Sequence, residues 1–404
     1  MERDMSGNGP LAGMKVIELA HIMAGPVCGL MLADMGADVI KVEKPDGDDS
    51  RRFVPPAIEG ESAAYMMMNR NKRGVALNLK QPEAVEALHR LLEEADVVIE
   101  NYRMGTMERL GLGYEALRAI NPRLIYCEIS GFGRTGPYAS RGGFDLIAQG
   151  MSGLMSITGE GPGRPPVKTG APVSDITAGI IAAMGVSAAY ARMLQTGQGQ
   201  KVDTSLFEAA ITQTYWQSAI AFATGVAPGP MGSAHPLNAP YQAFQTADGW
   251  ICVGAANQRN WLRFLEVIDA PELNDDPRFA SNHDRIRHLK ELEDILNSHL
   301  RRETSAVWLD RMETAGLPAG PVLDILEMQA DPQAQARGMI AEVDHPVAGA
   351  VRTLGHPIRF SETPASIRYA APLLGQHSRE VLREAGYGAD QIEAMLVSGA
   401  VIAA

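Results

Sequence analysis

The sequence predicts an α/β fold, with a doubly wound, mostly parallel sheet in a Rossmann-like large domain and a smaller α+β domain. Short apolar runs typical of strands alternate with helical patterns over the first third of the 404 residues. The Pro- and Gly-rich segment Val226–Gly232 then marks a change of composition. We expect the large domain at 1–225, the small domain at 226–325, and a linker and C-terminal return to the large domain at 326–404.

The first strand is expected at 14–19, followed by a turn at 24–26 and an apolar helix at 27–35. The alternation continues with strands at 36–43, 75–79, 97–99 and 124–130, and with a helix at 82–95. Parallel sheets of this kind bind ligands beyond the carboxyl ends of their strands. The loops after residues 20, 43, 99 and 130 are therefore the expected binding region.

A long Gly- and Pro-rich loop is expected at 135–173, followed by apolar helices from Ile176 to Leu194 and from Ser205 toward Ala223. Asp175 stands at the junction of loop and helix. A carboxylate there would cap the helix by accepting backbone N–H groups, and the local pattern taken alone favours this interpretation. The same position keeps a carboxylate ionised near the helix dipole, as a nucleophile requires.

Further along, two short strands are expected in Tyr241–Ala255 around the turn Asp248-Gly249, and a helix at 260–268. The C-terminal region predicts a strand at 339–343 and an amphipathic helix near 377–386.

The charge and the motifs exclude several functions. A net charge of −12 argues against nucleic acid as a partner, and no apolar run approaches the roughly 20 residues that span a membrane. Glycine fingerprints of dinucleotide-binding and P-loop proteins are absent, as are metal-binding histidine spacings. Three scattered cysteines fit a reducing cytoplasm. Basic residues near the predicted loops form either a phosphate site or solvated charge: Lys44, Arg51, Arg52, Asn69–Arg73, Arg103 and Arg109.

Several motifs occur in a fixed order along the chain. They are Leu11–Leu19, Ala24-Gly-Pro26, Gly36–Pro45, Asn69–Arg73, Val98–Leu112, Asn121–Tyr126, Gly131–Pro137, Gly143–Met155, Val173–Gly179 and Gly197–Asp203. Together they resemble the class III CoA-transferase family over nearly the whole chain, from Leu11 to about Tyr387.

The resemblance implies that Asp175 is the catalytic nucleophile, which reverses the preference for a cap. It also implies that CoA or an acyl-CoA is a substrate, with no metal and no tightly bound cofactor, and that the chain forms an interlocked homodimer. The residues that the family pattern assigns to CoA binding are Met23, Ala24, Lys44, Leu77, Asn101, Tyr102, Arg103, Arg109 and Phe144.

Details of the motifs indicate the substrate. Met23 and Gly142 stand where formyl-CoA transferases carry glutamine and lysine, whereas 232–244 resembles the branch that acts on dicarboxylates such as succinate and glutarate. We therefore expect transfer of CoA from an acyl-CoA, such as succinyl-CoA, to a carboxylic acid such as a dicarboxylate, through a mixed anhydride and an aspartyl-CoA thioester. The alternatives are a 2-methylacyl-CoA racemase, disfavoured because Phe144 replaces the histidine base before Asp145, and a non-catalytic CoA-binding protein.

Overall fold

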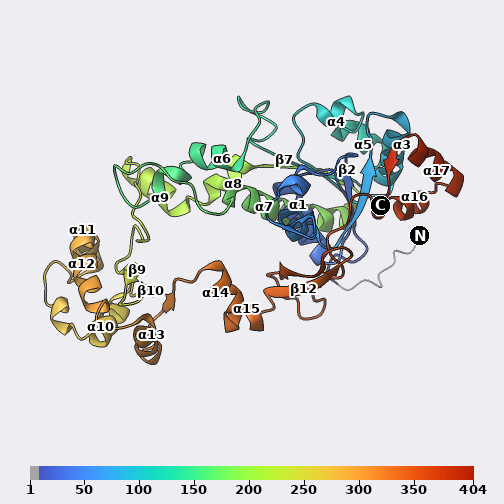
Figure 1. The fold of residues 1–404 in the computed structure, drawn as a ribbon. Coiled ribbons are helices and arrows are strands. Elements are labelled where there is room, and N and C mark those ends of the chain that lie inside the picture. Colours follow the sequence, from blue (N-terminus) through green and yellow to red (C-terminus); the bar gives the residue numbers. More distant parts are fainter. Residues whose placement is uncertain (1–8) are drawn as a thin grey trace. The chain divides into compact units, whose positions relative to one another are not determined.

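The computed structural model describes residues 9–404, and its contacts divide the chain into two compact units (Figure 1). The first unit contains the described residues up to Ser152, together with Thr169–Gln213 and Pro332–Ala404. The second unit contains Gly153–Lys168 and Thr214–Asp331. The domain limits expected at 225 and 325 stay a prediction.

A seven-stranded sheet forms the centre of the first unit, in the order β14-β5-β2-β1-β6-β7-β8. Every pairing is parallel except that of β14 with β5, which confirms the prediction of a mostly parallel sheet. The chain order reverses between β1 and β6, and such switch points are where doubly wound sheets bind ligands. The strands are β1 Lys15–Glu18, β2 Asp38–Glu43, β5 Lys72–Leu77, β6 Val97–Glu100, β7 Ile125–Ser130, β8 Lys201–Ser205 and β14 Val401–Ile402.

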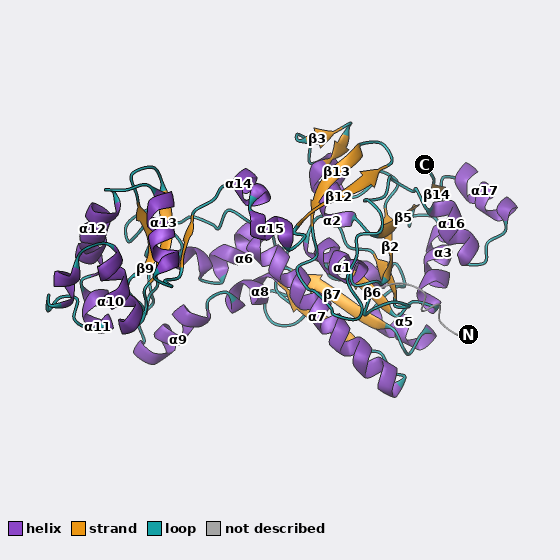
Figure 2. Cartoon of the chain, turned by 90° about the horizontal axis from the view of Figure 1, so that it is seen from below, coloured by secondary structure: helices purple, strands orange, loops and turns teal. Residues whose placement is uncertain are grey.

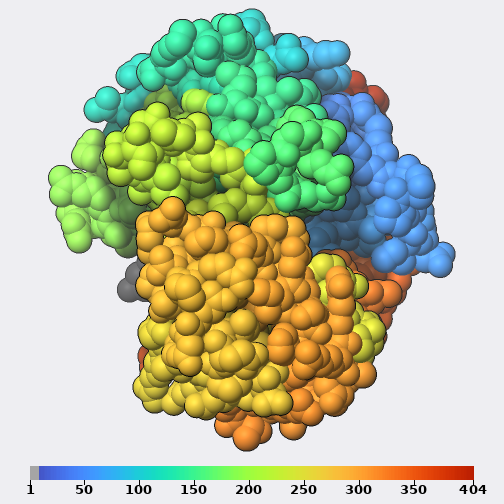
Figure 3. All heavy atoms as spheres, turned by 90° about the vertical axis from the view of Figure 1, so that its left-hand side faces the viewer, coloured from blue at the N-terminus to red at the C-terminus, as the bar shows by residue number. Residues whose placement is uncertain are grey.

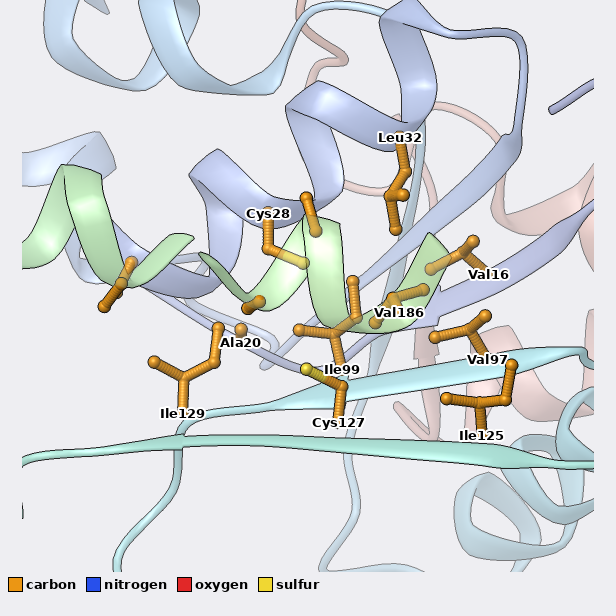
Figure 4. Close-up of a cluster of buried hydrophobic side chains, with 14 of the residues drawn as sticks. Val16, Ala20, Cys28, Leu32, Val97, Ile99, Ile125, Cys127, Ile129 and Val186 are labelled. Atoms are coloured by element: carbon orange, nitrogen blue, oxygen red, sulfur yellow. The ribbon is translucent and has the colours of Figure 1, made fainter. Parts of the chain in front are cut away.

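Helices cover both faces of this sheet. On one face lie α1 (Ala24–Asp34), α7 (Val173–Thr196) and α8 (Leu206–Thr212), and Figure 4 shows Cys28 and Leu32 of α1 above Val97, Ile99 and Cys127 of the strands. The other face packs against α3 Pro82–Glu93, α5 Tyr114–Ile120, α16 Ser378–Glu384 and α17 Ala389–Val397.

Helix α7 is long and apolar enough to cross a membrane by length and composition alone. Its buried residues, among them Ala178, Ala182 and Val186, belong instead to the core between the sheet and α1. A core helix passes the same composition test, so α7 is weak grounds for a membrane span.

The remaining elements of the first unit lie outside the central sheet (Figure 2). They are the 3-10 helix η1 Asp49–Arg52 (η marks 3-10 helices), β3 Ala57–Ile58, β4 Glu61–Ser62, α2 Ala63–Asn69, α4 Thr106–Arg109, α6 Asp145–Met151, α15 Pro332–Ala336, β12 Ile340–His345 and β13 Gly349–Leu354. Helix α6 lies inside the segment 135–173 that was expected to be a loop. Its residues Leu146, Ala148 and Gln149 are good helix formers, but they lie between two glycine-rich stretches, which favour the prediction of a loop.

The second unit has its own core, and Figure 3 shows much of its surface in yellow and orange. A three-stranded antiparallel sheet packs against helices through Phe244, Trp261 and Phe264. The helix expected from Ser205 toward Ala223 is interrupted at Gln213-Thr214, so α9 belongs to this unit. The elements are η2 Leu154–Ile157, α9 Tyr215–Thr224, β9 Tyr241–Gln245, β10 Trp250–Gly254, α10 Gln258–Val267, η3 Pro271–Asn274, α11 Asn282–Arg287, α12 Leu289–Leu300, α13 Ser305–Thr314, β11 Ala319–Pro321 and α14 Ile325–Ala330.

Candidate active site

A cavity of about 500 Å³ opens at the carboxyl ends of the central strands, entirely within the first unit. That volume lies within the range of small-molecule sites. Its walls come from the loop after β1, the loop after β6, the end of β7, the segment 139–144 and the first turn of α7. The predicted site residues that line it are Met23, Ala24, Asn101, Tyr102, Arg103, Phe144 and Asp175.

The turn after β1 is held in an unusual conformation. Ile22 has a φ of 69°, in the left-handed region that β-branched residues rarely adopt. Its N–H donates to the carboxylate of Asp48 at 3.1 Å. The side chain of Asn101 accepts from the N–H of His21 at 3.0 Å and donates to the carbonyl of His21 at 2.8 Å. These bonds fix the wall of the cavity.

A fully buried group of charges lies beneath this turn. The Nζ of Lys41 contacts Glu18 at 3.1 Å and Asp48 at 2.8 Å, and donates to the carbonyl of Ala20 at 2.9 Å. The Nζ of Lys72 lies 2.8 Å from the other oxygen of Glu18 and donates to the carbonyl of Pro26 at 2.9 Å. Lys41 therefore connects the sheet to the turn, and Lys72 connects it to α1.

Several basic residues that the sequence analysis grouped near the loops form ion pairs inside the protein. Arg51 donates to Glu43 at 2.7 Å, and Arg70 contacts Asp34 at 2.6 Å. Both arginines are largely buried, so neither the phosphate-site nor the solvated-charge interpretation holds for them.

Two glycines allow the loops on one side of the cavity to touch. A Cβ on Gly131 would lie 2.7 Å from the Cα of Gly143, and a Cβ on Gly143 would lie 2.5 Å from the Cα of Gly131. No real Cβ contact is that short, so both positions require glycine. The close approach brings Phe144 and α6 next to the end of β7.

Asp175 is the third residue of α7 and does not cap it. The N-cap is Pro172, no side-chain cap bond comes from it, and the N–H of Ser174 instead donates to the carboxylate of Asp145 at 2.9 Å. Within residues 9–404 the Asp175 carboxylate accepts no hydrogen bond. The interpretation of Asp175 as a helix cap is therefore wrong, and its carboxylate is left facing the cavity.

Burial raises the pKa of the Asp175 carboxyl to about 6, and the negative charge of Asp145 adds to the increase. At neutral pH the group is still mainly ionised. A carboxylate with a raised pKa is a stronger nucleophile than an ordinary one when it is ionised.

Positive charge is also available on the cavity wall. Arg103 and Arg141 line the cavity, and in the described part of the chain neither forms an ion pair. Arg141 lies over the ring of Tyr138, with 4.0 Å from its guanidinium carbon to the ring centroid. Arg134, by contrast, is committed to Glu100 at 2.7 Å. Arg141 was not predicted from the sequence, where its only signal was its place beside Gly142-Gly143.

Three predicted CoA-binding residues lie away from this cavity. Lys44 lines a smaller neighbouring cavity and pairs with Asp49 at 2.8 Å. Arg109 lies on an open surface hollow, and its guanidinium donates to Thr106. Leu77 is the last residue of β5, where it pairs with Val401 and its side chain is buried in the core. Its side chain is therefore committed to packing.

Comparison with known proteins identifies the family. The sequence model of the family described as "CoA-transferase family III" matches residues 11–378. The chain is 43% identical over 385 residues to succinate--glutarate CoA-transferase of Agrobacterium fabrum, covering 93% of this chain and 95% of that protein. It is 37% identical to the human succinyl-CoA:glutarate CoA-transferase, covering 99% and 92% of the two chains.

The chain is also similar to solved structures. The crystal structure of a CAIB/BAIF family protein from Brucella suis superposes with a TM-score of 0.84 at 40% identity, covering 94% of this chain and all of that one. The chain therefore belongs to CoA-transferase family III, which confirms both the family and the enzyme class that its motifs predicted.

Proposed function

We propose that this enzyme moves CoA from succinyl-CoA or a similar acyl-CoA to a dicarboxylate acceptor, with Asp175 as the covalent nucleophile. The observation that carries the proposal is the Asp175 carboxylate itself, which accepts no hydrogen bond from the described residues and lies on the wall of a cavity that also presents Arg103 and Arg141. The names of the relatives from Agrobacterium fabrum and Homo sapiens support succinate and glutarate as the class of acids.

The first half of the reaction loads CoA onto the enzyme. An oxygen of Asp175 attacks the thioester carbon of the donor, the C–S bond breaks, and a mixed anhydride and CoA thiolate form. The thiolate then attacks the aspartyl carbonyl of the anhydride. This step releases the donor acid as its carboxylate and leaves an aspartyl-CoA thioester.

The second half reverses these steps with the acceptor. The acceptor carboxylate attacks the aspartyl thioester and expels the thiolate, which gives a second mixed anhydride. The thiolate attacks the acceptor carbonyl of that anhydride, so the products are the new acyl-CoA and free Asp175. No net proton or electron is exchanged, and the site must only stabilise oxyanions and exclude water.

CoA is proposed to run along the strand-end loops. Met23 and Ala24 would contact it by the turn after β1, and Asn101, Tyr102 and Arg103 after β6. Lys44 and Arg109 are proposed to reach its phosphates from the neighbouring hollows, since phosphates attract such cations. Leu77 is proposed to approach the adenine only through its backbone, because its side chain is buried.

We also propose that the chain acts in the cytoplasm as a homodimer. Large apolar side chains are exposed in each unit, among them Met184 of α7, 66% exposed, and Phe222 of α9, 88% exposed. Such patches usually mark a protein interface. Light scattering on the purified protein is expected to give about twice the chain mass of 43.4 kDa. A value equal to the chain mass would contradict the dimer.

A substrate panel tests the proposed function. The enzyme is incubated with succinyl-CoA and, separately, glutarate, other dicarboxylates and monocarboxylates of matched length, and the thioesters are separated by chromatography. New dicarboxyl-CoA thioesters are expected, with kcat/KM at least about tenfold higher for dicarboxylates, which is the worth of one charge-assisted bond. Equal rates for both acid classes would contradict the acceptor class. Solvent deuterium entering next to the thioester carbonyl, without transfer, would favour a racemase.

A further inference from the structure

Asp145 occupies a connecting position between three segments of the first unit. It begins α6, and its carboxylate has two separate partners. One oxygen accepts from the N–H of Ser174, in the first turn of α7, at 2.9 Å. The other accepts from the side-chain amide of Gln149, one turn along α6, at 2.8 Å.

Gln149 extends this connection to the loop before α7. Its side chain is completely buried, and its carbonyl oxygen accepts from the N–H of Thr169 at 2.9 Å and from the Thr169 hydroxyl at 3.1 Å. Because the amide donates to Asp145 and the oxygen accepts from Thr169, both ends of the Gln149 side chain are satisfied. The chain of bonds therefore holds both sides of the loop 170–172, immediately before Asp175.

We propose that Asp145 is a positioning residue for CoA transfer: by capping the first turn of α7 from a different helix, it leaves the Asp175 carboxylate free and fixed for attack on the thioester. This inference rests on the proposed role of Asp175 as nucleophile. A helix of this length needs its first N–H groups satisfied, and aspartate is a preferred cap. If Asp175 performed that task itself, its oxygens would be occupied by the helix.

The arrangement also places two carboxylates near each other. Among the described residues, Asp145 is the one charged group that shifts the pKa of Asp175, and it acts in the same direction as burial. The cavity wall also carries other charged or titratable side chains, and all of them are still present when Asp145 is replaced: His21, Asp49, Tyr102, Arg103, Arg134 and Arg141. The pH dependence of the reaction therefore reports on Asp145 separately from any effect on folding.

The test compares two substitutions with the wild type. The profile of kcat/KM for succinyl-CoA against pH is measured well below the melting temperature of each protein. For the wild type it is expected to fall as the pH decreases through about 6, where Asp175 becomes protonated. Asp145→Asn keeps an oxygen for the Ser174 N–H but removes the charge, and its amide NH2 replaces the oxygen that accepts from Gln149. The acid limb of its profile, where kcat/KM falls as the pH decreases, is expected at lower pH than in the wild type. Its midpoint should still lie above the ordinary aspartate pKa of about 3.9, because Asp175 stays buried.

Asp145→Ala removes the cap as well as the charge. Its kcat is expected to fall on the order of 100-fold, the effect of a slightly misplaced reacting group, while KM for succinyl-CoA changes little. Asp390→Asn is the matched control, because Asp390 is an exposed residue in the first turn of α17 and does not line the cavity. It is expected to leave both the pH limb and kcat unchanged.

Two results would overturn the inference. They are an acid limb in Asp145→Asn that coincides with the wild type, and a kcat in Asp145→Ala within about twofold of the wild type. Asp175→Ala is assayed in parallel. If Asp175→Ala retains transfer, the proposed function fails; if it is inactive while the Asp145 variants behave like the wild type, only the role of Asp145 fails.

Discussion

Asp175→Ala is expected to reduce CoA transfer at least about a thousandfold, because no carboxylate remains to accept the acyl group. Asp175→Asn should give the same loss, since an amide of nearly the same size is not a nucleophile. The measurement is the initial rate of formation of a dicarboxyl-CoA thioester from succinyl-CoA near neutral pH. KM for the donor is expected to change less than kcat, because the cavity wall stays in place.

The intermediate itself gives a second observation. Hydroxylamine added during turnover is expected to convert an aspartyl thioester into a hydroxamate on the peptide that contains Asp175, as detected by mass spectrometry. The label should require succinyl-CoA and should be absent from Asp175→Ala. Transfer by Asp175→Ala within about tenfold of the wild-type rate would contradict the mechanism.

Loss of activity in Asp175→Asn should not come from unfolding. The pKa of about 6 in the folded protein lies above the ordinary value of about 3.9, so ionised Asp175 destabilises the fold. This cost is fully present above pH about 6 and disappears as the pH falls below about 4. Asp175→Asn is therefore expected to raise the free energy of unfolding at neutral pH by roughly 1 to 3 kcal/mol, measured by urea denaturation.

The sequence predicted those parts of the fold that carry strong apolar periodicity. Strands β1, β2, β6 and β7 are largely buried and carry paired or alternating apolar residues, interrupted by a few charged ones such as Glu18 and Lys41. Strand β8 was missed because Lys201–Ser205 is an edge strand with one apolar residue. Strand β14 was missed because it has only two residues, which pair with β5 from the far end of the chain. No local sequence pattern predicts such a contact.

The site was predictable where it depends on loop ends and unpredictable where it depends on side-chain contacts. The loops after β1, β6 and β7 line the cavity because parallel strands bring their carboxyl ends together. The contact of Asp145 with Ser174 joins residues 29 positions apart and has no sequence signature. Likewise, Leu77 follows the family pattern in sequence, but packing decides that its side chain, at the end of β5, lies in the core.

The largest loss of stability is expected from Glu18→Gln. This change keeps the size of the side chain but removes the charge that pairs with both Lys41 and Lys72. Breaking a buried ion pair from one side leaves an uncompensated charge, and the expected cost is about 3 to 5 kcal/mol of the free energy of unfolding. Urea denaturation of the wild type and the variant at the same pH measures it.

Glu94→Gln is the matched control, because Glu94 pairs with Lys15 at 2.8 Å, as Glu18 does with Lys72, but both partners are more than half exposed. Its cost is expected to stay below about 1 kcal/mol. Similar losses in the two variants would show that burial of the Glu18 pairs is irrelevant.

The packing of α1 makes Glu18 hard to replace. A Cβ on Gly29 would lie 1.8 Å from the Glu18 carboxylate, so α1 is fitted around this charge. The same two lysines hold the carbonyls of Ala20 and Pro26, on either side of the turn that forms the cavity wall. Glu18→Gln is therefore also expected to raise KM for succinyl-CoA, because the turn loses part of its support.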